Sequence, residues 1–260
     1  MNNVSKTLYI PLYGKALVSK RGIILEDKMA EKIWDAESFE LRGKAKSKWL
    51  AYYMGVRSAV FDRWVKEKID AIPNAVVLHI GCGMDSRIRR VGNGRNLWVD
   101  VDFPEVIEER KKYYEESDTY KMIPGDARDA EWLSGISGDE AIVVMEGISM
   151  YLKGEEIRGL FKALSDKFDK VHILMDAYSV FAAKMSKIKN PINEVGVTEV
   201  YGIDQPAELT EGTSLSYLGE GEMTPAEFIN QLEGLERKIF SKLYAGKMSK
   251  KLYKLYEFEK

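Results

Sequence analysis

The sequence predicts an α/β protein whose core is a doubly wound, mostly parallel sheet, and three observations lead to this fold class. Short apolar runs alternate with segments of helical periodicity. The first run breaks into a glycine turn at Gly81 and Gly83. Three later runs end at or just before an acidic residue, namely Asp102, Asp126 and Glu146. Strands that alternate with helices are normally parallel, so these ends should meet along one edge of the sheet.

The first 72 residues are predicted to form a helical cap before the sheet begins. An apolar stripe recurs there every three or four positions, as on the buried side of an amphipathic helix. The stripe consists of Trp49, Tyr53, Val56, Val60 and Trp64. Arg57 lies at the edge of the stripe, where its side chain could reach inward toward the sheet. A surface arginine is the alternative, because most arginines are exposed.

Five strands and three intervening helices follow from the apolar pattern. The predicted strands span residues 76–80, 96–102, 120–123, 141–146 and 171–177. The predicted helices span residues 105–116, 129–133 and 153–168. Pro104 is expected at the start of the first of these helices, because proline has the right φ for that position and loses no hydrogen bond there.

The last third of the chain departs from this rhythm. Residues 179–220 are expected to form loops or a short helical lid. Thr224 and Glu227 match a capping box with Pro225 between them, which predicts a helix from there to Ile239. Residues 251–260 alternate apolar and polar side chains, as a half-buried strand does, and suit an antiparallel strand at or near the sheet edge.

The glycine turn is typical of a site for a nucleotide-like cofactor. Glycines let the backbone turn tightly and approach a ligand at the carboxyl end of a parallel strand. Ser86 stands where a dinucleotide fingerprint requires its third glycine, which disfavours an NAD-dependent oxidoreductase. Asp100 and Asp102 follow about 20 residues after the glycines, as expected of partners for ribose hydroxyls. The alternative is that these two acids only solubilise the end of a strand.

Composition agrees with an enzyme of one domain and argues against other classes. The chain has 260 residues, with 39 Lys and Arg against 41 Asp and Glu, so no strong field favours nucleic acid. The single cysteine, Cys82, excludes an internal disulfide and fits a reducing compartment. No apolar run approaches the roughly 20 residues that span a bilayer, and no secretory leader is recognised. We therefore expect a cytoplasmic protein without a membrane or nucleic-acid partner; no metal site is predicted, and the oligomeric state is not indicated.

Five ordered segments together resemble the leucine carboxyl methyltransferase-like branch of the class I S-adenosylmethionine (SAM)-dependent O-methyltransferases, which includes polyketide-type enzymes. The resemblance covers about residues 7–180, and ordered motifs are more specific than one glycine loop. The segments are Tyr52-Tyr-Met-Gly-Val-Arg57-Ser-Ala-Val-Phe61-Asp62, Gly81-Cys-Gly-Met-Asp85-Ser-Arg87, Val99-Asp-Val-Asp102-Phe-Pro104, Gly125-Asp126-Ala-Arg128-Asp129 and Met145-Glu146-Gly-Ile-Ser-Met-Tyr151-Leu152.

The resemblance implies a seven-stranded, Rossmann-like methyltransferase sheet in a single domain of residues 1–260. Within it, residues 1–72 would form the cap, 73–178 the SAM-binding core, and 179–260 a lid with a C-terminal helix and strand. SAM would be the cofactor and S-adenosylhomocysteine the product. The expected cofactor-binding residues are Arg57, His79, Gly81, Cys82, Gly83, Asp85, Arg87, Asp100, Asp102, Phe103, Asp126, Ala127 and Glu146.

The resemblance also assigns parts of the cofactor to particular residues. Arg57 would bind the SAM carboxylate, a task that suits the paired donors of a guanidinium. Asp126 and Ala127 would lie at the adenine end, and Glu146 near the methionine part or the lip of the acceptor site. The alternatives are helix capping for Asp126 and Asp129 and an ordinary strand-end charge for Glu146.

The chemical class of the methyl acceptor follows from the lack of a histidine that could act as a general base. His79 and His172 both fall inside predicted core strands, and neither is placed as a base, although His79 could support the cofactor loop from below. A carboxylate, with a reference pKa of about 4, is already ionised at neutral pH and needs no base. This favours methylation of a carboxylate of a small molecule or a peptide terminus.

Other functions stay open at this stage. Glu146, Tyr151 or Tyr178 could still activate a phenol or hydroxyl, for example of a polyketide-like metabolite, and these three are the catalytic candidates. A non-catalytic SAM-binding protein is a further alternative, because a fold does not guarantee turnover.

Overall fold

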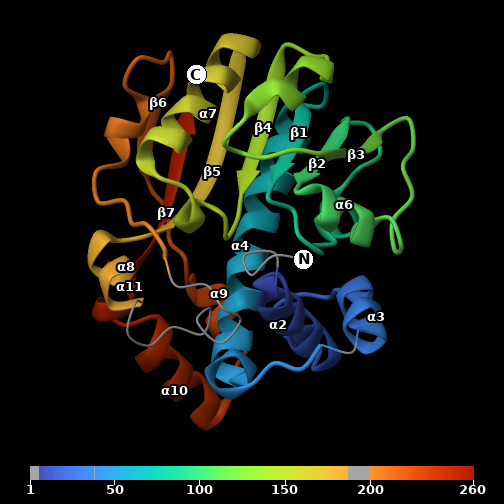
Figure 1. Ribbon diagram of the computed structural model, residues 1–260. Helices are drawn as coiled ribbons and strands as arrows, with labels where there is room; N and C mark the ends of the chain where they lie inside the picture. Colours follow the sequence, from blue (N-terminus) through green and yellow to red (C-terminus); the bar gives the residue numbers. More distant parts are fainter. Residues whose placement is uncertain (1–5, 38, 187–198) are drawn as a thin grey trace.

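The computed structural model describes residues 6–37, 39–186 and 199–260, and its centre is one seven-stranded sheet (Figure 1). The strand order is β3-β2-β1-β4-β5-β7-β6. Neighbours among β1 to β5 pair in parallel, while β7 is antiparallel to both β5 and β6. The strands are β1 (Val76–Ile80), β2 (Trp98–Asp102), β3 (Tyr120–Pro124), β4 (Glu140–Met145), β5 (Lys170–Tyr178), β6 (Ser216–Glu220) and β7 (Tyr253–Glu259).

Helices cover both faces of this sheet, which confirms the doubly wound α/β class. The α-helices are α2 (Tyr9–Lys20), α3 (Lys28–Ala36), α4 (Lys48–Ala71), α5 (Arg87–Val91), α6 (Pro104–Arg110), α7 (Gly154–Lys167), α8 (Val180–Ser186), α9 (Ala226–Ile229), α10 (Gly234–Tyr244) and α11 (Lys247–Leu252). Short 3-10 helices are η1 (Gly43–Lys46), η2 (Ala130–Gly135), η3 (Ser149–Tyr151) and η5 (Pro206–Thr210).

Two apolar layers, one on each face, hold the sheet. Strand β1 is buried along its whole length, as expected of a parallel strand covered by helices on both sides. Its residue Val77 faces the layer formed with α2 and α4, whereas Leu78 faces the layer that contains α7. The 24-residue helix α4 packs along α2 and next to β4. Figure 1 shows α2 and α3 on one side of the lower part of α4, and α8, α10 and α11 on its other side.

The C-terminal strand lies inside the sheet rather than at its border. The alternation of residues 251–260 correctly predicts β7, which is antiparallel and second from the edge, with β6 outside it. Its apolar residues Leu255 and Phe258 point to opposite faces. The position of β7 brings Tyr253, its first residue, to the carboxyl end of β5, where the two strands pair at Tyr178.

Some predicted boundaries are wrong, for local reasons. The single helix expected from Thr224 to Ile239 is two helices, α9 and α10, and Gly234, the first residue of α10, has a φ of +51°. Pro225 is the N-cap of α9 rather than its first helical residue. The expected helix 105–116 ends at Arg110, and the segment near 129–133 forms the 3-10 helix η2 with Asp129 as its cap.

Two further observations concern the chain as a whole. None of the helices in the described ranges is long and apolar enough to cross a membrane. Part of the predicted lid, residues 187–198, lies outside the described residues, as do residues 1–5 of the predicted cap.

Candidate active site

A cavity of about 940 Å³ opens where the carboxyl ends of β1, β2 and β4 meet the cap helices. It has a polar end, lined by residues that include Arg57, Gly81, Asp102, Asp126 and Glu146. It also has an apolar end, lined by residues that include Tyr53, Met54, Met150, Tyr151 and Tyr178. All the site residues predicted from the sequence line this cavity except Arg87 and Asp100, which lie behind its wall. A cavity of this size is near the upper end of the range for small-molecule sites.

The glycine loop after β1 has a backbone shape that only glycine adopts easily. Gly81 has a φ of +71° and Gly83 a φ of +50°. A Cβ on Gly81 would lie 2.7 Å from the side chain of Ile148, so both conformation and space require glycine there. The amide of Gly81 donates to the carbonyl of Val101 at 2.8 Å, which ties the loop to β2.

Asp102, at the end of β2, holds the loop from the side. Its Oδ2 accepts the Gly83 amide at 2.7 Å, and its Oδ1 accepts the Phe103 amide at 2.8 Å. Burial raises the pKa of Asp102 to about 6, even though both amide bonds favour the charged form. The carboxyl group therefore titrates just below neutral pH while it faces the cavity.

Asp100 acts below the loop instead of inside the cavity. It is fully buried and accepts hydrogen bonds from Arg110 and from the Tyr120 hydroxyl. Burial alone would raise its pKa, but Arg110 and His79 lower it to about 2. Arg110 also donates to the carbonyls of Gly83 and Asp85. No sequence motif marks Arg110, which supports the glycine loop from beneath.

Glu146 lies between two buried arginines. Its Oε1 accepts from Arg57 Nε at 2.9 Å, and its Oε2 accepts from Arg87 Nη2. Burial would raise the pKa of Glu146, but the guanidinium groups of Arg87 and Arg57 lower it to about 2. Arg87 is fully buried and reaches Asp62 on α4 with its Nε at 2.7 Å. Both predicted residues, Glu146 and Arg87, thus belong to one buried ionic cluster.

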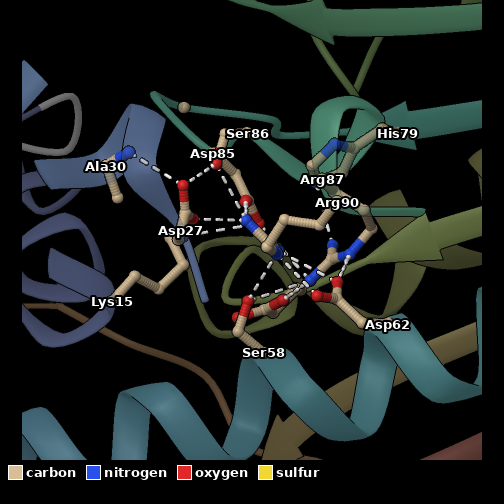
Figure 2. A network of polar contacts seen from close by, with 12 residues as sticks. Lys15, Asp27, Ala30, Ser58, Asp62, His79, Asp85, Ser86, Arg87 and Arg90 are labelled. Carbon is tan, nitrogen blue, oxygen red and sulfur yellow. Dashed lines mark hydrogen bonds and ion pairs between the residues drawn. The ribbon is translucent and has the colours of Figure 1, made fainter. Parts of the chain in front are cut away.

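This cluster continues into the cap, as Figure 2 shows. Arg90 donates to Asp27 at 2.6 Å, to Asp85 at 2.8 Å and to Asp62 at 2.5 Å. Asp27 also caps α3 by accepting the Ala30 amide at 2.8 Å. Charges buried this deeply are tolerated because each one is paired. The network therefore fixes the cap relative to the glycine loop and α4.

Lys15 of α2 is a second residue that the sequence analysis missed. Its side chain lines the cavity and is almost completely buried. Its ammonium lies 3.4 Å from Asp85 Oδ2, and no hydrogen bond holds it within the described part of the chain. An ammonium has three donors, so this one keeps donor capacity for an anion in the cavity.

Arg57 is held on its other side by the C-terminal half of the chain. Its Nη1 donates to the Tyr253 hydroxyl at 2.9 Å and lies 3.4 Å from Asp176 Oδ2. A Cβ on Gly147, whose φ is +73°, would lie 3.2 Å from Arg57 Nη2. Among the described residues, no hydrogen bond uses Nη2 itself. The guanidinium is thus fixed by its partners and still has a free donor.

The far part of the polar end contains Asp126, Ala127 and Arg128. Asp126 follows β3 and is bound by the Arg128 side chain and backbone amide, each at 2.9 Å. Burial would raise the pKa of Asp126, but these bonds from Arg128 lower it. Behind it, a Cβ on Gly125 would lie 2.8 Å from the ring of Trp132, which makes this corner narrow.

The apolar end has few groups that can move protons. Burial raises the pKa of Tyr151 and of Tyr53 above the ordinary tyrosine value. His79 is buried beneath the loop, with Nδ1 3.3 Å from Asp100. His172 bonds to Glu140 and Glu259 and does not line the cavity. In the described ranges, no group of three His, Cys, Asp or Glu side chains is placed to hold a metal ion.

The polar end has the chemistry needed to hold SAM. Arg57 and Lys15 offer donors for an amino-acid carboxylate, and the glycine loop leaves room for close backbone approach. The Asp102 carboxyl can accept from ribose hydroxyls, and the corner at Ala127 is narrow and partly apolar, as a purine ring requires. Fold and site together define a SAM-dependent methyltransferase.

Comparisons with known proteins agree with this class. The family model for leucine carboxyl methyltransferase matches residues 3–165. Because that is well over half of the chain, the protein belongs to the leucine carboxyl methyltransferase family. Its SAM cofactor and its methyltransferase activity follow from this membership together with the site.

Sequence relatives extend the similarity beyond the family model. The chain is 27% identical over 246 residues to the tetracenomycin polyketide synthesis O-methyltransferase TcmP of Streptomyces glaucescens, covering 92% of this chain and 90% of that protein. It is also 27% identical over 183 residues to the SAM-dependent methyltransferase dpfgK of Gibberella zeae, covering 64% of this chain and 61% of that protein.

Solved structures share the fold. A DUF574 family protein from Streptomyces avermitilis has a TM-score of 0.60 at 13% identity, covering 89% of this chain and 90% of that chain. Magnesium protoporphyrin IX methyltransferase from Synechocystis, solved with bound S-adenosylhomocysteine, has a TM-score of 0.52 at 11% identity, covering 84% of this chain and 90% of that chain.

Proposed function

We propose that the protein transfers the methyl group of SAM to an oxygen, and that the acceptor oxygen belongs to a carboxylate of a small molecule or a peptide terminus. The cap and the segments after β5 would build the acceptor site, since the apolar end of the cavity is lined by residues from these parts. SAM, when bound, supplies an electrophilic methyl group that passes directly to the acceptor. The protein's residues then mainly hold and orient the two reactants, which can lower a barrier by roughly 7 to 11 kcal/mol.

One observation supports a carboxylate as the methyl acceptor. Among the described residues, the carboxylates that line the cavity are Asp85, Asp102, Asp126 and Glu146. All four are at the polar end. Glu146, the one acid among the predicted catalytic residues, has a pKa of about 2, and its two oxygens accept hydrogen bonds from two arginines. It is therefore a poor base, and it is better suited to orienting Arg57.

The tyrosines do not replace a base. Burial raises the pKa of Tyr151 above its ordinary value, so its phenolate is scarce near neutral pH. Tyr178 lines the cavity too and can donate a hydrogen bond to an acceptor. We assign both tyrosines to holding the acceptor. An acceptor that is already ionised, as a carboxylate is at pH 7, fits such a site best.

The test is single-turnover methyl transfer at saturating SAM, with a panel of aryl and alkyl carboxylates and matched phenols, between about pH 6 and 9. With a carboxylate acceptor the rate should stay level, because the acceptor is already ionised and saturating SAM removes the effect that Asp102, with its pKa of about 6, has on SAM binding. Methylation restricted to phenols, or a steep rise of the rate with pH, would reject the carboxylate and favour the phenol or hydroxyl alternative. Absence of transfer to any oxygen acceptor, with SAM bound, would favour a non-catalytic SAM-binding role.

A further inference from the structure

Four large apolar side chains surround the mouth of the cavity and are exposed although they also line it. We call them the rim: Phe181, Met185, Leu243 and Met248. Their exposed fractions are 58%, 50%, 51% and 67%, respectively. In the described ranges, the other large apolar side chains with such exposure are Leu218 and Leu235, and neither lines the cavity. Exposed apolar surface is therefore concentrated at this opening.

The rim is continuous with the apolar end of the cavity. Phe181 and Met185 lie one turn apart on α8, which follows closely after the half-buried Tyr178 at the end of β5. Leu243 precedes Tyr244, the last residue of α10, whose ring stacks on Tyr53 at a centroid distance of 4.8 Å. An apolar path thus leads from the inner tyrosines to the outer surface. Concentrated apolar surface of this kind usually marks a place where a ligand or partner binds.

Basic residues adjoin the rim residues in the sequence. Lys184 lies between the two rim residues of α8, and Lys242 and Lys247 flank the two rim residues of α10 and α11. All three are exposed, and none forms an ion pair within the described part of the chain. Their charge favours an acidic molecule at the opening, and it disfavours a basic one.

We propose that the rim binds the apolar body of an amphiphilic acid, whose carboxylate enters the cavity while its hydrocarbon or aromatic part remains on Phe181, Met185, Leu243 and Met248. The proposal rests on the methyl transfer to carboxylates argued above and specifies its substrate class. The acceptor is longer than the apolar end alone can enclose, and its contact with the rim contributes to KM rather than to the chemical step. Acids without such a body are poor acceptors.

The experiment compares short and long acids that share the same reacting group. Benzoate and 4-octylbenzoate serve as the pair, and initial rates give KM and kcat for each. KM should be at least about tenfold lower for 4-octylbenzoate, since burying several methylenes against the exposed rim side chains is worth well over 1.4 kcal/mol. Equal KM values for the two acids would overturn the proposal.

Variants locate the effect on the rim. The double substitution Phe181→Ser and Met248→Ser should raise KM for 4-octylbenzoate about tenfold, leave KM for benzoate nearly unchanged and leave the SAM dissociation constant unchanged. Leu235→Ser is the matched control, because Leu235 is 71% exposed on α10 and does not line the cavity. If KM for 4-octylbenzoate rises similarly in both variants, or in neither, the rim is not the site that binds the apolar body.

A binding measurement keeps this test separate from the test of the reaction. The fluorescent aromatic sulfonate 1-anilinonaphthalene-8-sulfonate is an amphiphilic anion that needs no turnover. It should bind the wild-type and Leu235→Ser proteins alike and the rim variant several-fold more weakly. If the rim variant binds the probe more weakly but the wild type does not methylate carboxylates, the rim is a binding site and the proposed reaction is wrong. If all three proteins bind the probe equally, the rim is not the binding site. Rim-dependent sedimentation with anionic phospholipid vesicles would assign the rim to a membrane surface instead and overturn the proposal.

Discussion

The hydroxyl of Tyr253 lies between the guanidinium of Arg57 and the carboxyl of Asp176. Arg57 Nη1 donates to it at 2.9 Å, and the hydroxyl donates to Asp176 Oδ2 at 2.5 Å. Burial raises the pKa of Tyr253 well above its ordinary value, so the hydroxyl keeps the proton that it donates. Asp176 in turn accepts the Gly147 amide at 2.7 Å. The first residue of β7 therefore fixes the arginine that faces the cofactor end of the cavity.

Removing this hydroxyl should loosen Arg57. We expect Tyr253→Phe to raise the SAM dissociation constant about tenfold, because a hydrogen bond to a charged group contributes about 1.5 to 3 kcal/mol. Calorimetric titration measures the change. Tyr256→Phe is the control on the same strand, since its hydroxyl donates to the Ile203 carbonyl at 3.0 Å and does not line the cavity. Equal SAM affinity in the two variants would contradict the role given to Tyr253.

Gly147 should be needed for the space it leaves beside Arg57. Gly147→Ala is expected to weaken SAM binding severalfold, because the new Cβ would press on Arg57 Nη2 at 3.2 Å. Gly94→Ala separates this effect from backbone strain, as Gly94 has a similar φ of +70° and open space around it. Both variants should lose about 1 to 2 kcal/mol of stability in denaturant titrations. Only the first should bind SAM poorly; a similar loss of binding in both would point to strain alone.

Asp102 should make SAM binding depend on pH. Its pKa of about 6 means that the carboxyl group gains a proton as the pH falls through 6. The charged form is the better acceptor for ribose hydroxyls. The affinity for SAM should therefore be highest above pH 7 and fall below pH 6, by up to about tenfold per pH unit. Titrations between pH 5 and 8 measure this slope. Asp102→Asn should bind more weakly and lose the slope, and a slope that persists in this variant would assign it to another group.

Asp27 should stabilise the whole fold, because it joins α3 to Ser86 and Arg90 in the buried network. Asp27→Ala leaves Arg90 with one carboxylate fewer in a buried site, and we expect a loss of about 3 kcal/mol in the free energy of unfolding. Asp35→Ala, on the same helix but in an exposed pair with Lys20, should lose less than about 1 kcal/mol. Urea titrations of both proteins test the difference, and similar midpoints would be inconsistent with it.

Local patterns in the sequence predicted the parts of the fold that local rules control. The run at Val76, the glycines after it and the alternation near Tyr253 each predict an element within a few residues of where it lies. The break before Gly234 was missed, because an apolar stripe continues across it, whereas the backbone is extended at Glu233 and has a positive φ at Gly234. Hydrophobic periodicity indicates which side of a segment is apolar, but it does not indicate where the backbone turns within that segment.

Residues of the candidate site that lie within a recognised motif could be predicted from the sequence. Residues that only folding brings to the site could not. The resemblance placed Arg57 and Glu146 near the cofactor, and they form an ion pair at 2.9 Å. Tyr253 and Lys15 were missed, since neither lies in one of the recognised segments. Lys15 lies in the middle of α2 and is almost completely buried, so the apolar residues around it in the sequence are the signal that could have indicated it.

The contact between Arg57 and Tyr253 joins residues 196 positions apart, and this has a consequence for synthesis on the ribosome. Domains begin to fold while the chain is still emerging, from the N-terminal side. Strands β1 to β5 and both arginines around Glu146 emerge well before Tyr253. A nascent chain therefore carries the glycine loop and the buried ion pairs while Arg57 still lacks its last partner. The affinity for SAM should therefore reach its full value only after β7 has paired with β5 and β6. Tight SAM binding by a nascent chain would then indicate that β7 has been synthesised.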